Sequence, residues 1–170
     1  MAKWEDKTIT AILVDGGFYR RRAYACLGDK SPEERADELE EYCIRHLTER
    51  KGYRHQLYRI FYYDCPPISK KIYNPLTKQQ IDLSKSDTYN WSNIFFDCLK
   101  RKRKFALRYG KLAEAQAHYN LTERAFRKLC NGSLKFEDIT EKDCVLNVEQ
   151  KGVDMKIGLD IASLAYKHQV

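Results

Sequence analysis

The stretch Ile9-Thr10-Ala11-Ile12-Leu13-Val14-Asp15-Gly16-Gly17 decides the expected fold. Residues 9–14 are apolar or β-branched without a regular polar alternation, which is typical of a strand buried on both faces of a parallel sheet. The Asp15-Gly16-Gly17 sequence is expected to end this strand in a turn. We therefore expect residues 9–14 to form the central strand of an α/β domain.

A helix and a second strand are expected to follow. Ser31-Pro32-Glu33-Glu34 combines an N-cap serine, a proline at the first helical position and acidic residues in the first turn, which predicts a helix running towards Arg50 and Gly52. Residues 57–64, LYRIFYYD, predict a strand that ends before the Pro66-Pro67 pair, because proline cannot donate to a sheet ladder. Strand, helix and strand in this order predict an α/β fold.

Residues 68–143 are longer than a normal crossover connection and are expected to form a largely helical insertion. Apolar residues at helical spacing from Trp91 to Phe105 predict one helix, and a shorter helix is expected to stop at Asn131-Gly132. Residues 145–148 are expected to be a short edge strand or an extended lead-in. The chain shows no internal repeat or low-complexity linker, so residues 1–170 are expected to form a single domain.

The composition favours a polyanionic partner. The 170-residue chain has a formal net charge of +7 and a pI near 9.0, and its 43% hydrophobic residues are enough for one core. Nucleic acid is the partner class expected first. Residues 1–7 are polar where a signal peptide has its apolar core, and no apolar run is long enough to cross a bilayer, so a cytoplasmic location away from membranes is expected. The cysteines show no C-x-x-C spacing, which argues against a zinc site.

The stretch QKGVDMKIGLDIASLA, residues 150–165, places two aspartates on an expected helix. On a helical period its apolar residues form one broad arc, and Asp154 falls in the middle of that arc. A carboxylate there is expected to be buried, either as a cap in the first helical turn or as a metal ligand. Asp160 lies about 120° away at the border of the polar arc, where solvent or a salt bridge would satisfy it.

Two further carboxylates are expected where strands end. Asp15 and Asp64 each close an expected strand, and ligands of an open parallel sheet collect at the carboxyl ends of its strands. Each aspartate alone is better explained by a turn. Asp15 and Asp154 together would offer oxygen ligands to Mg²⁺ or Mn²⁺, which can activate water and stabilise a phosphodiester transition state. This combination predicts a metal-dependent nuclease.

Three stretches of the chain resemble the NYN domain family, relatives of the PIN-domain ribonucleases. They are AILVDGGF at residues 11–18, RIFYYD at 59–64 and QKGVDMKIGLDIASLA at 150–165. The resemblance implies a PIN-like three-layer fold with a central parallel sheet flanked by helices, and a metal-dependent endoribonuclease activity on RNA. It also implies that Asp15 and Asp154 are the catalytic metal ligands, makes Asp160 a further candidate ligand, and gives Asp64 an accessory position.

The chain departs from the family pattern at two places. Gly17, Phe18 and Tyr19 occupy the region where many members carry an asparagine after the first aspartate. Family members usually continue from the last helix into another strand with further aspartates, whereas this chain reaches Val170 first. The domain is therefore expected to be incomplete at its C-terminus: the chain is either the N-terminal part of a longer protein, or a truncated form with an incomplete metal site and an exposed sheet edge. A homodimer is a further partner considered.

Basic and aromatic residues are expected to contact RNA. The expected phosphate contacts are Arg20, Arg21, Arg22, Lys100, Arg101, Lys102 and Arg103, although such runs are also ordinary solvated surfaces. An exposed tyrosine such as Tyr19 or Tyr109 would stack on a base. The alternative to an enzyme is a non-catalytic RNA-binding or regulatory module with an incomplete acidic site. A phosphatase for small nucleotides would require a closed pocket.

Overall fold

The centre of the structure is a three-stranded parallel sheet. The computed structural model describes residues 8–48 and 55–170. The strands β1 (Thr8–Asp15), β2 (His55–Asp64) and β5 (Phe105–Tyr109) pair in the order β1-β2-β5. The central strand is β2, so the expectation that residues 9–14 would be central is wrong. The reason lies in burial: residues 60–65 are all buried, whereas β1 is exposed or half-buried along its length.

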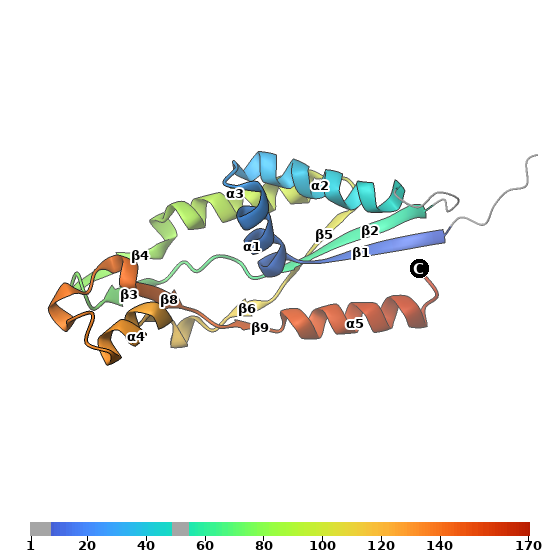
Figure 1. The fold of residues 1–170 in the computed structure, drawn as a ribbon. Helices are drawn as coiled ribbons and strands as arrows, with labels where there is room; N and C mark the ends of the chain where they lie inside the picture. The colour runs from blue at the N-terminus through green and yellow to red at the C-terminus, as the bar shows by residue number, and fades with distance from the viewer. Residues whose placement is uncertain (1–7, 49–54) are drawn as a thin grey trace, which may run out of the picture.

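Helices cover both faces of this sheet, and the fold is mixed α/β as expected (Figure 1). One face carries α1 (Gly16–Leu27), α2 (Pro32–Thr48) and α3 (Asp87–Arg101), and the other carries α5 (Val153–Tyr166). Side chains of β2 alternate between the two layers. Ile60 and Tyr62 pack with the first group of helices, while Phe61 and Tyr63 pack with α5. Among the described residues, no helix is long and apolar enough to cross a membrane.

Local sequence signals start the helices. The Ser31 hydroxyl accepts a hydrogen bond from the Glu34 N–H (3.2 Å), and the Ser31 N–H donates to Glu34 Oε2 (2.9 Å), which is a capping box. The expected start of α2 is thus confirmed, while its expected end near Arg50 and Gly52 lies outside the described residues. Helix α1 was not predicted. It begins at Gly16, directly after β1, so the Asp15-Gly16-Gly17 sequence opens a helix instead of a turn.

The stretch 68–143 is not the helical insertion that was expected. Its β5 pairs with β2, and its α3 buries Phe95, Phe96 and Leu99 in the main core, so both elements belong to the central fold. Phe105, expected at the end of a helix, instead begins β5, because the chain turns at Lys104, which has a positive φ. The shorter helix does end at Asn131, as expected.

The rest of the chain forms a small lobe beyond the carboxyl ends of the strands (Figure 1). Two-stranded antiparallel ladders join β3 to β4, β6 to β9 and β7 to β8. Its elements are β3 (Lys71–Asn74), β4 (Gln79–Asp82), β6 (Lys111–Leu112), β7 (His118–Leu121), α4 (Glu123–Cys130), β8 (Cys144–Asn147) and β9 (Gln150–Lys151), with 3₁₀ turns at Leu83–Lys85, Glu114–Gln116, Phe136–Asp138 and Glu141–Asp143. The short strand expected at residues 145–148 is confirmed as β8.

Candidate functional site

Asp15 and Asp154 line one pocket at the carboxyl edge of the sheet. Asp15 is the last residue of β1, and Asp154 stands in the first turn of α5. The short strand β9, held by its pairing with β6, brings the chain to the start of α5 beside β1. The pocket is lined by Asp15, Gly17, Arg21, Gln150, Gly152, Val153, Asp154 and Met155.

Asp15 also has a structural task. Its Oδ1 accepts a hydrogen bond from the Phe18 N–H (2.9 Å), so it is the N-cap of α1. The second carboxylate oxygen, Oδ2, accepts no hydrogen bond from the part of the chain that the structure describes. The cap therefore orients the carboxylate and leaves one oxygen for a ligand.

Asp154 is exposed, which corrects the expectation that it would be buried in an apolar arc. Only part of that arc meets the sheet: Val153 and Leu164 are buried and Ile157 is half-buried, while Ile161 is 53% exposed. Asp154 follows Val153 by about 100° around the helix and so points away from the core. The cost of burying a carboxylate consequently gives no argument for a metal ion at Asp154.

Gln150 is a site residue that the sequence did not reveal. A Cβ added at Gly17 would lie 3.5 Å from Asp15 Oδ1 and 3.6 Å from Gln150 Oε1, so both oxygens border the same small space. An uncharged amide is common on surfaces and carries no signal of its own. Its position directly before the Lys151-Gly152-Val153-Asp154 motif was the available hint.

Asp64 lies beneath the pocket and does not line it. It is 1% exposed and accepts hydrogen bonds from the Cys65 N–H (2.8 Å) and the Tyr62 hydroxyl (3.2 Å). Arg20 Nη2 lies 2.9 Å from Asp64 Oδ2. Burial raises the pKa of the Asp64 carboxyl above its usual range, although the Arg20 charge opposes this change. Asp64 therefore supports α1 from the core.

Asp160 is held elsewhere on α5. Its Oδ2 accepts hydrogen bonds from the Tyr63 hydroxyl (2.8 Å) and Arg108 Nε (3.0 Å). It lies six positions after Asp154 in the helix, which is about 9 Å along the axis. The salt bridge agrees with its expected place at the border of the polar arc. The structure thus does not bring Asp160 to the pocket with Asp15 and Asp154.

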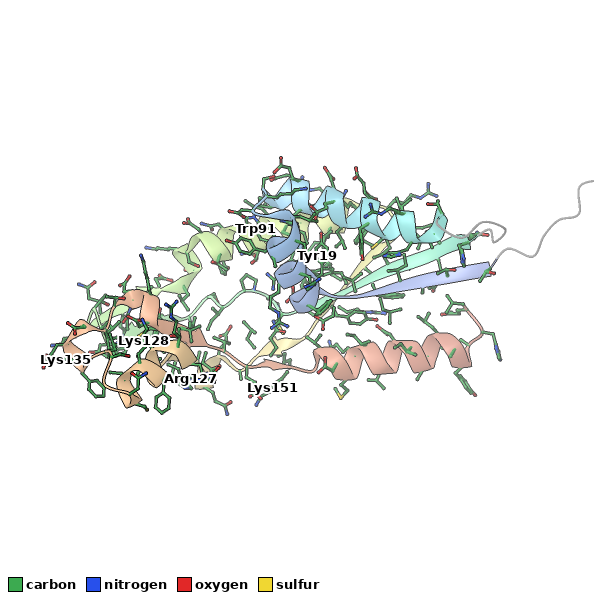
Figure 2. All side chains as sticks on the ribbon, in the orientation of Figure 1. Tyr19, Trp91, Arg127, Lys128, Lys135 and Lys151 are labelled. Carbon is green, nitrogen blue, oxygen red and sulfur yellow. The ribbon has the colours of Figure 1, made fainter. Side chains whose placement is uncertain are left out.

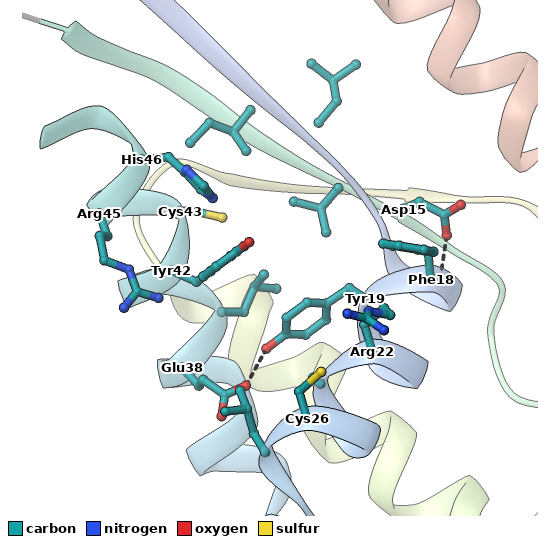
Figure 3. Close-up of a pocket in the computed structure, with 16 residues that line it drawn as sticks. Asp15, Phe18, Tyr19, Arg22, Cys26, Glu38, Tyr42, Cys43, Arg45 and His46 are labelled. Carbon is teal, nitrogen blue, oxygen red and sulfur yellow. Dashed lines mark hydrogen bonds between the residues drawn. The ribbon is translucent and has the colours of Figure 1, made fainter. Parts of the chain in front are cut away.

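The arginines that follow Asp15 point in three directions. Arg21 lines the acidic pocket, and Arg20 is bound to Asp64. Arg22 borders a second hollow between β1, α1 and α2, which shares Asp15 with the acidic pocket (Figure 3). Tyr19 lies in the same hollow, where its hydroxyl donates to Glu38 Oε1 (3.1 Å), so its ring is part of the packing and is not presented to a base.

The run from Lys100 to Arg103 lies far from this pocket. It spans the last turn of α3 and the start of the connection to β5, so it stands at the amino ends of the strands, roughly 15 Å from their carboxyl ends. Lys100 pairs with Asp97, and Lys102 pairs with Asp37 and Glu40. Arg101 and Arg103 are exposed. This run does not adjoin the acidic pocket.

Within residues 8–48 and 55–170, no group of three or more His, Cys, Asp or Glu side chains converges in the arrangement of a metal site. The pocket offers two carboxylates and one amide oxygen. Comparison with protein-family models, with curated proteins and with solved structures found no match to this chain.

Proposed function

We propose that this chain is a metal-dependent endoribonuclease of the NYN and PIN-like type, which hydrolyses RNA at the pocket of Asp15 and Asp154. One observation supports it: two aspartates from opposite ends of the sequence line one pocket at the carboxyl edge of a parallel sheet. That edge is where open α/β sheets bind ligands. The PIN-like classification rests on the resemblance of the three stretches and is part of the proposal.

The donor set suits a hard divalent cation. Asp15, Asp154 and Gln150 offer only oxygen, which is the ligand type of Mg²⁺ and Mn²⁺. When bound, such an ion activates water and stabilises negative charge on a phosphate. Arg21 borders the same pocket and would hold a phosphate oxygen of the RNA beside the carboxylates. The excess positive charge of the chain, +7, favours the same polyanionic partner.

Cleavage of a labelled single-stranded RNA, with Mn²⁺ or with EDTA, tests the proposal. Asparagine caps helices as well as aspartate, so Asp15→Asn keeps α1 and removes the charge. We expect Asp15→Asn and Asp154→Asn each to reduce cleavage about a hundredfold, equivalent to ~3 kcal/mol of transition-state stabilisation. Both should also weaken Mn²⁺ binding measured by calorimetry.

Asp97→Asn is the matched control. It removes an exposed carboxylate from α3, outside the pocket, and is expected to keep wild-type cleavage and Mn²⁺ binding. Cleavage that continues in EDTA, or that both pocket variants retain, would contradict the proposal.

A second candidate is a non-catalytic RNA-binding or regulatory module. It is favoured by the finding that no third acidic, histidine or cysteine side chain joins the two aspartates in the described part of the chain. Two carboxylates hold a divalent ion more weakly than three. This candidate predicts RNA binding without cleavage and without measurable Mn²⁺ affinity, so the same experiment separates the two.

A further inference from the structure

The acidic pocket continues into a longer groove along α1. A neighbouring hollow shares Gly17, Arg21 and Gln150 with the pocket, and a third hollow shares Arg20 and Tyr24 with the second. The third hollow reaches the start of α3, where Trp91 lies (Figure 2). We call these three adjoining hollows the α1 groove; beyond the acidic pocket its lining includes Arg20, Tyr24, Asp29, Lys30, Asp87 and Trp91.

One stripe of α1 forms the wall of this groove. Gly17, Arg20, Arg21 and Tyr24 follow the spacing i, i+3, i+4 and i+7, which places them on one side of a helix. From Gly17 to Tyr24 the stripe spans about 10 Å. The helix therefore presents, in order from the acidic pocket, an open backbone, two cations and an aromatic ring.

The middle of the groove suits phosphates. Arg21 is exposed and makes no ion pair with the residues that the structure describes. Arg20 is held by Asp64 and by Ser92 Oγ (3.4 Å), and 28% of its side chain remains exposed. Arginines at this position can contact a phosphate backbone without reading its sequence.

The far end of the groove suits a nucleobase. Tyr24 is 66% exposed. Trp91 is held in place by its indole N–H, which donates to the Lys30 carbonyl (3.1 Å), and by stacking on Phe95 with the ring centroids 5.1 Å apart. Aromatic faces of this kind stack on bases.

The charges at this end disfavour a phosphate. Lys30 and Arg35 are both paired with Glu38, while the Asp29 and Asp87 carboxylates add acceptors. A flat group with N–H donors is complementary to such a pocket, whereas an anion is not.

We propose that the α1 groove binds single-stranded RNA, with its backbone across Arg20 and Arg21 and one unstacked base between Tyr24 and Trp91. This inference rests on the proposed function, because it gives the RNA its path away from the acidic pocket. A base inside a duplex cannot enter the Tyr24 and Trp91 pocket, so the groove selects single strands over double strands.

Trp91 provides a direct readout of this binding. The chain has two tryptophans, and Trp4→Phe leaves Trp91 as the single emitter. In EDTA, a short single-stranded RNA is expected to quench this emission in a saturable manner. Tyr24→Ala is expected to weaken binding about tenfold, and Arg21→Gln to weaken it and reduce its salt dependence.

Tyr166→Ala is the matched control, because Tyr166 is 85% exposed at the other end of the molecule on α5. It is expected to bind RNA like wild type. An RNA duplex of the same sequence is expected not to quench Trp91. RNA binding without quenching, wild-type affinity in Tyr24→Ala, or quenching by a free nucleoside monophosphate at equal concentration would overturn the proposal.

Failure of this proposal and failure of the nuclease proposal have different signatures. Quenching that Tyr24→Ala weakens, with no cleavage in Mn²⁺, would support the groove and refute the nuclease. Cleavage abolished by Asp15→Asn, with no quenching and no effect of Tyr24→Ala on KM, would support the nuclease and refute the groove.

Discussion

Arg20→Met tests the ion pair that lies beneath the candidate site. Arg20 Nη2 lies 2.9 and 3.1 Å from the two oxygens of Asp64, which is 1% exposed. Methionine keeps the apolar part of the arginine side chain and removes its charge. The variant would therefore leave a buried carboxylate without its cation.

Removing one partner of a buried ion pair costs about 3–5 kcal/mol. The Arg20 side chain is 28% exposed, so water would reach the vacated space, and we expect the low end, about 3 kcal/mol at pH 7. For a chain of this length that free energy lowers Tm by about 6–12 °C.

The cost should depend on pH. Burial raises the pKa of Asp64 while Arg20 opposes it, so the variant should have a still higher pKa at Asp64. With a raised carboxyl pKa, the unfolded state holds fewer protons than the folded state between the usual and the raised value, and stability falls as pH rises through that range. The variant should be closest to wild type at about pH 4 and should lose most stability at neutral pH.

Urea unfolding, followed by far-ultraviolet circular dichroism, measures the free energy of unfolding of the variant and of wild type at about pH 4 and pH 7. Arg22→Met, an exposed arginine of the same helix, is the control and should change stability by less than about 0.5 kcal/mol. Asp64→Asn in the Arg20→Met background should restore most of the loss, because the amide oxygen can accept from the Cys65 N–H and the amide N–H can donate to the Tyr62 hydroxyl. A loss under about 1 kcal/mol, or one equal at both pH values, would refute the reasoning.

Three further changes test other parts of the structure. Gly16→Ala should lower the free energy of unfolding by about 1–3 kcal/mol, because the added Cβ would lie 2.5 Å from the Tyr62 ring. Gly17→Ala should keep or raise Tm, because its added Cβ would have no neighbour nearer than 3.5 Å. Equal changes of Tm in the two variants would contradict this packing. Glu38 is partly buried, which raises the pKa of its carboxyl, but hydrogen bonds from Lys30, Arg35 and Tyr19 together with the Arg35 charge outweigh this and lower it. The stabilisation by Glu38 is therefore lost as pH falls through the lowered pKa, and Glu38→Gln should flatten the acid loss of stability in urea titrations below about pH 5. An unchanged slope would contradict this. If two copies pair through the edge strand β1, Ile9→Lys should yield monomers in light scattering, because Ile9 is on that strand and is 46% exposed. A wild-type protein that is already monomeric would contradict this pairing.

The main strands and α2 could be predicted because their signals are local. The apolar run before Asp15 and the capping box at Ser31 each specify an element from a few neighbouring residues. The place of β5 could not be predicted in the same way. Its five residues follow a charged run, and only the long-range pairing of Ile60 with Phe105 makes them the third strand of the sheet.

The site could be predicted only where local sequence signals mark its residues, and not where long-range contacts decide their position. Strand ends and the resemblance pointed to Asp15 and Asp154, and the structure places both at one pocket. Periodicity alone could not tell which side of α5 meets the sheet, so the exposure of Asp154 was missed. The pairing of Asp160 with Tyr63 also depends on a contact between distant parts of the chain.

The two glycines after Asp15 show how a turn-like sequence can serve a site. Neither has a positive φ, so neither is needed for a left-handed turn. Gly16 is required by close approach, because a Cβ there would lie 2.6 Å from Asp64 Oδ2. Gly17 keeps the space between Asp15 and Gln150 open. Gly16 thus allows α1 to pack closely on the buried ion pair, which stabilises the core. Gly17 leaves the Asp15 carboxylate accessible to a ligand. The same two-residue sequence therefore serves both the packing of the core and the access to the candidate site.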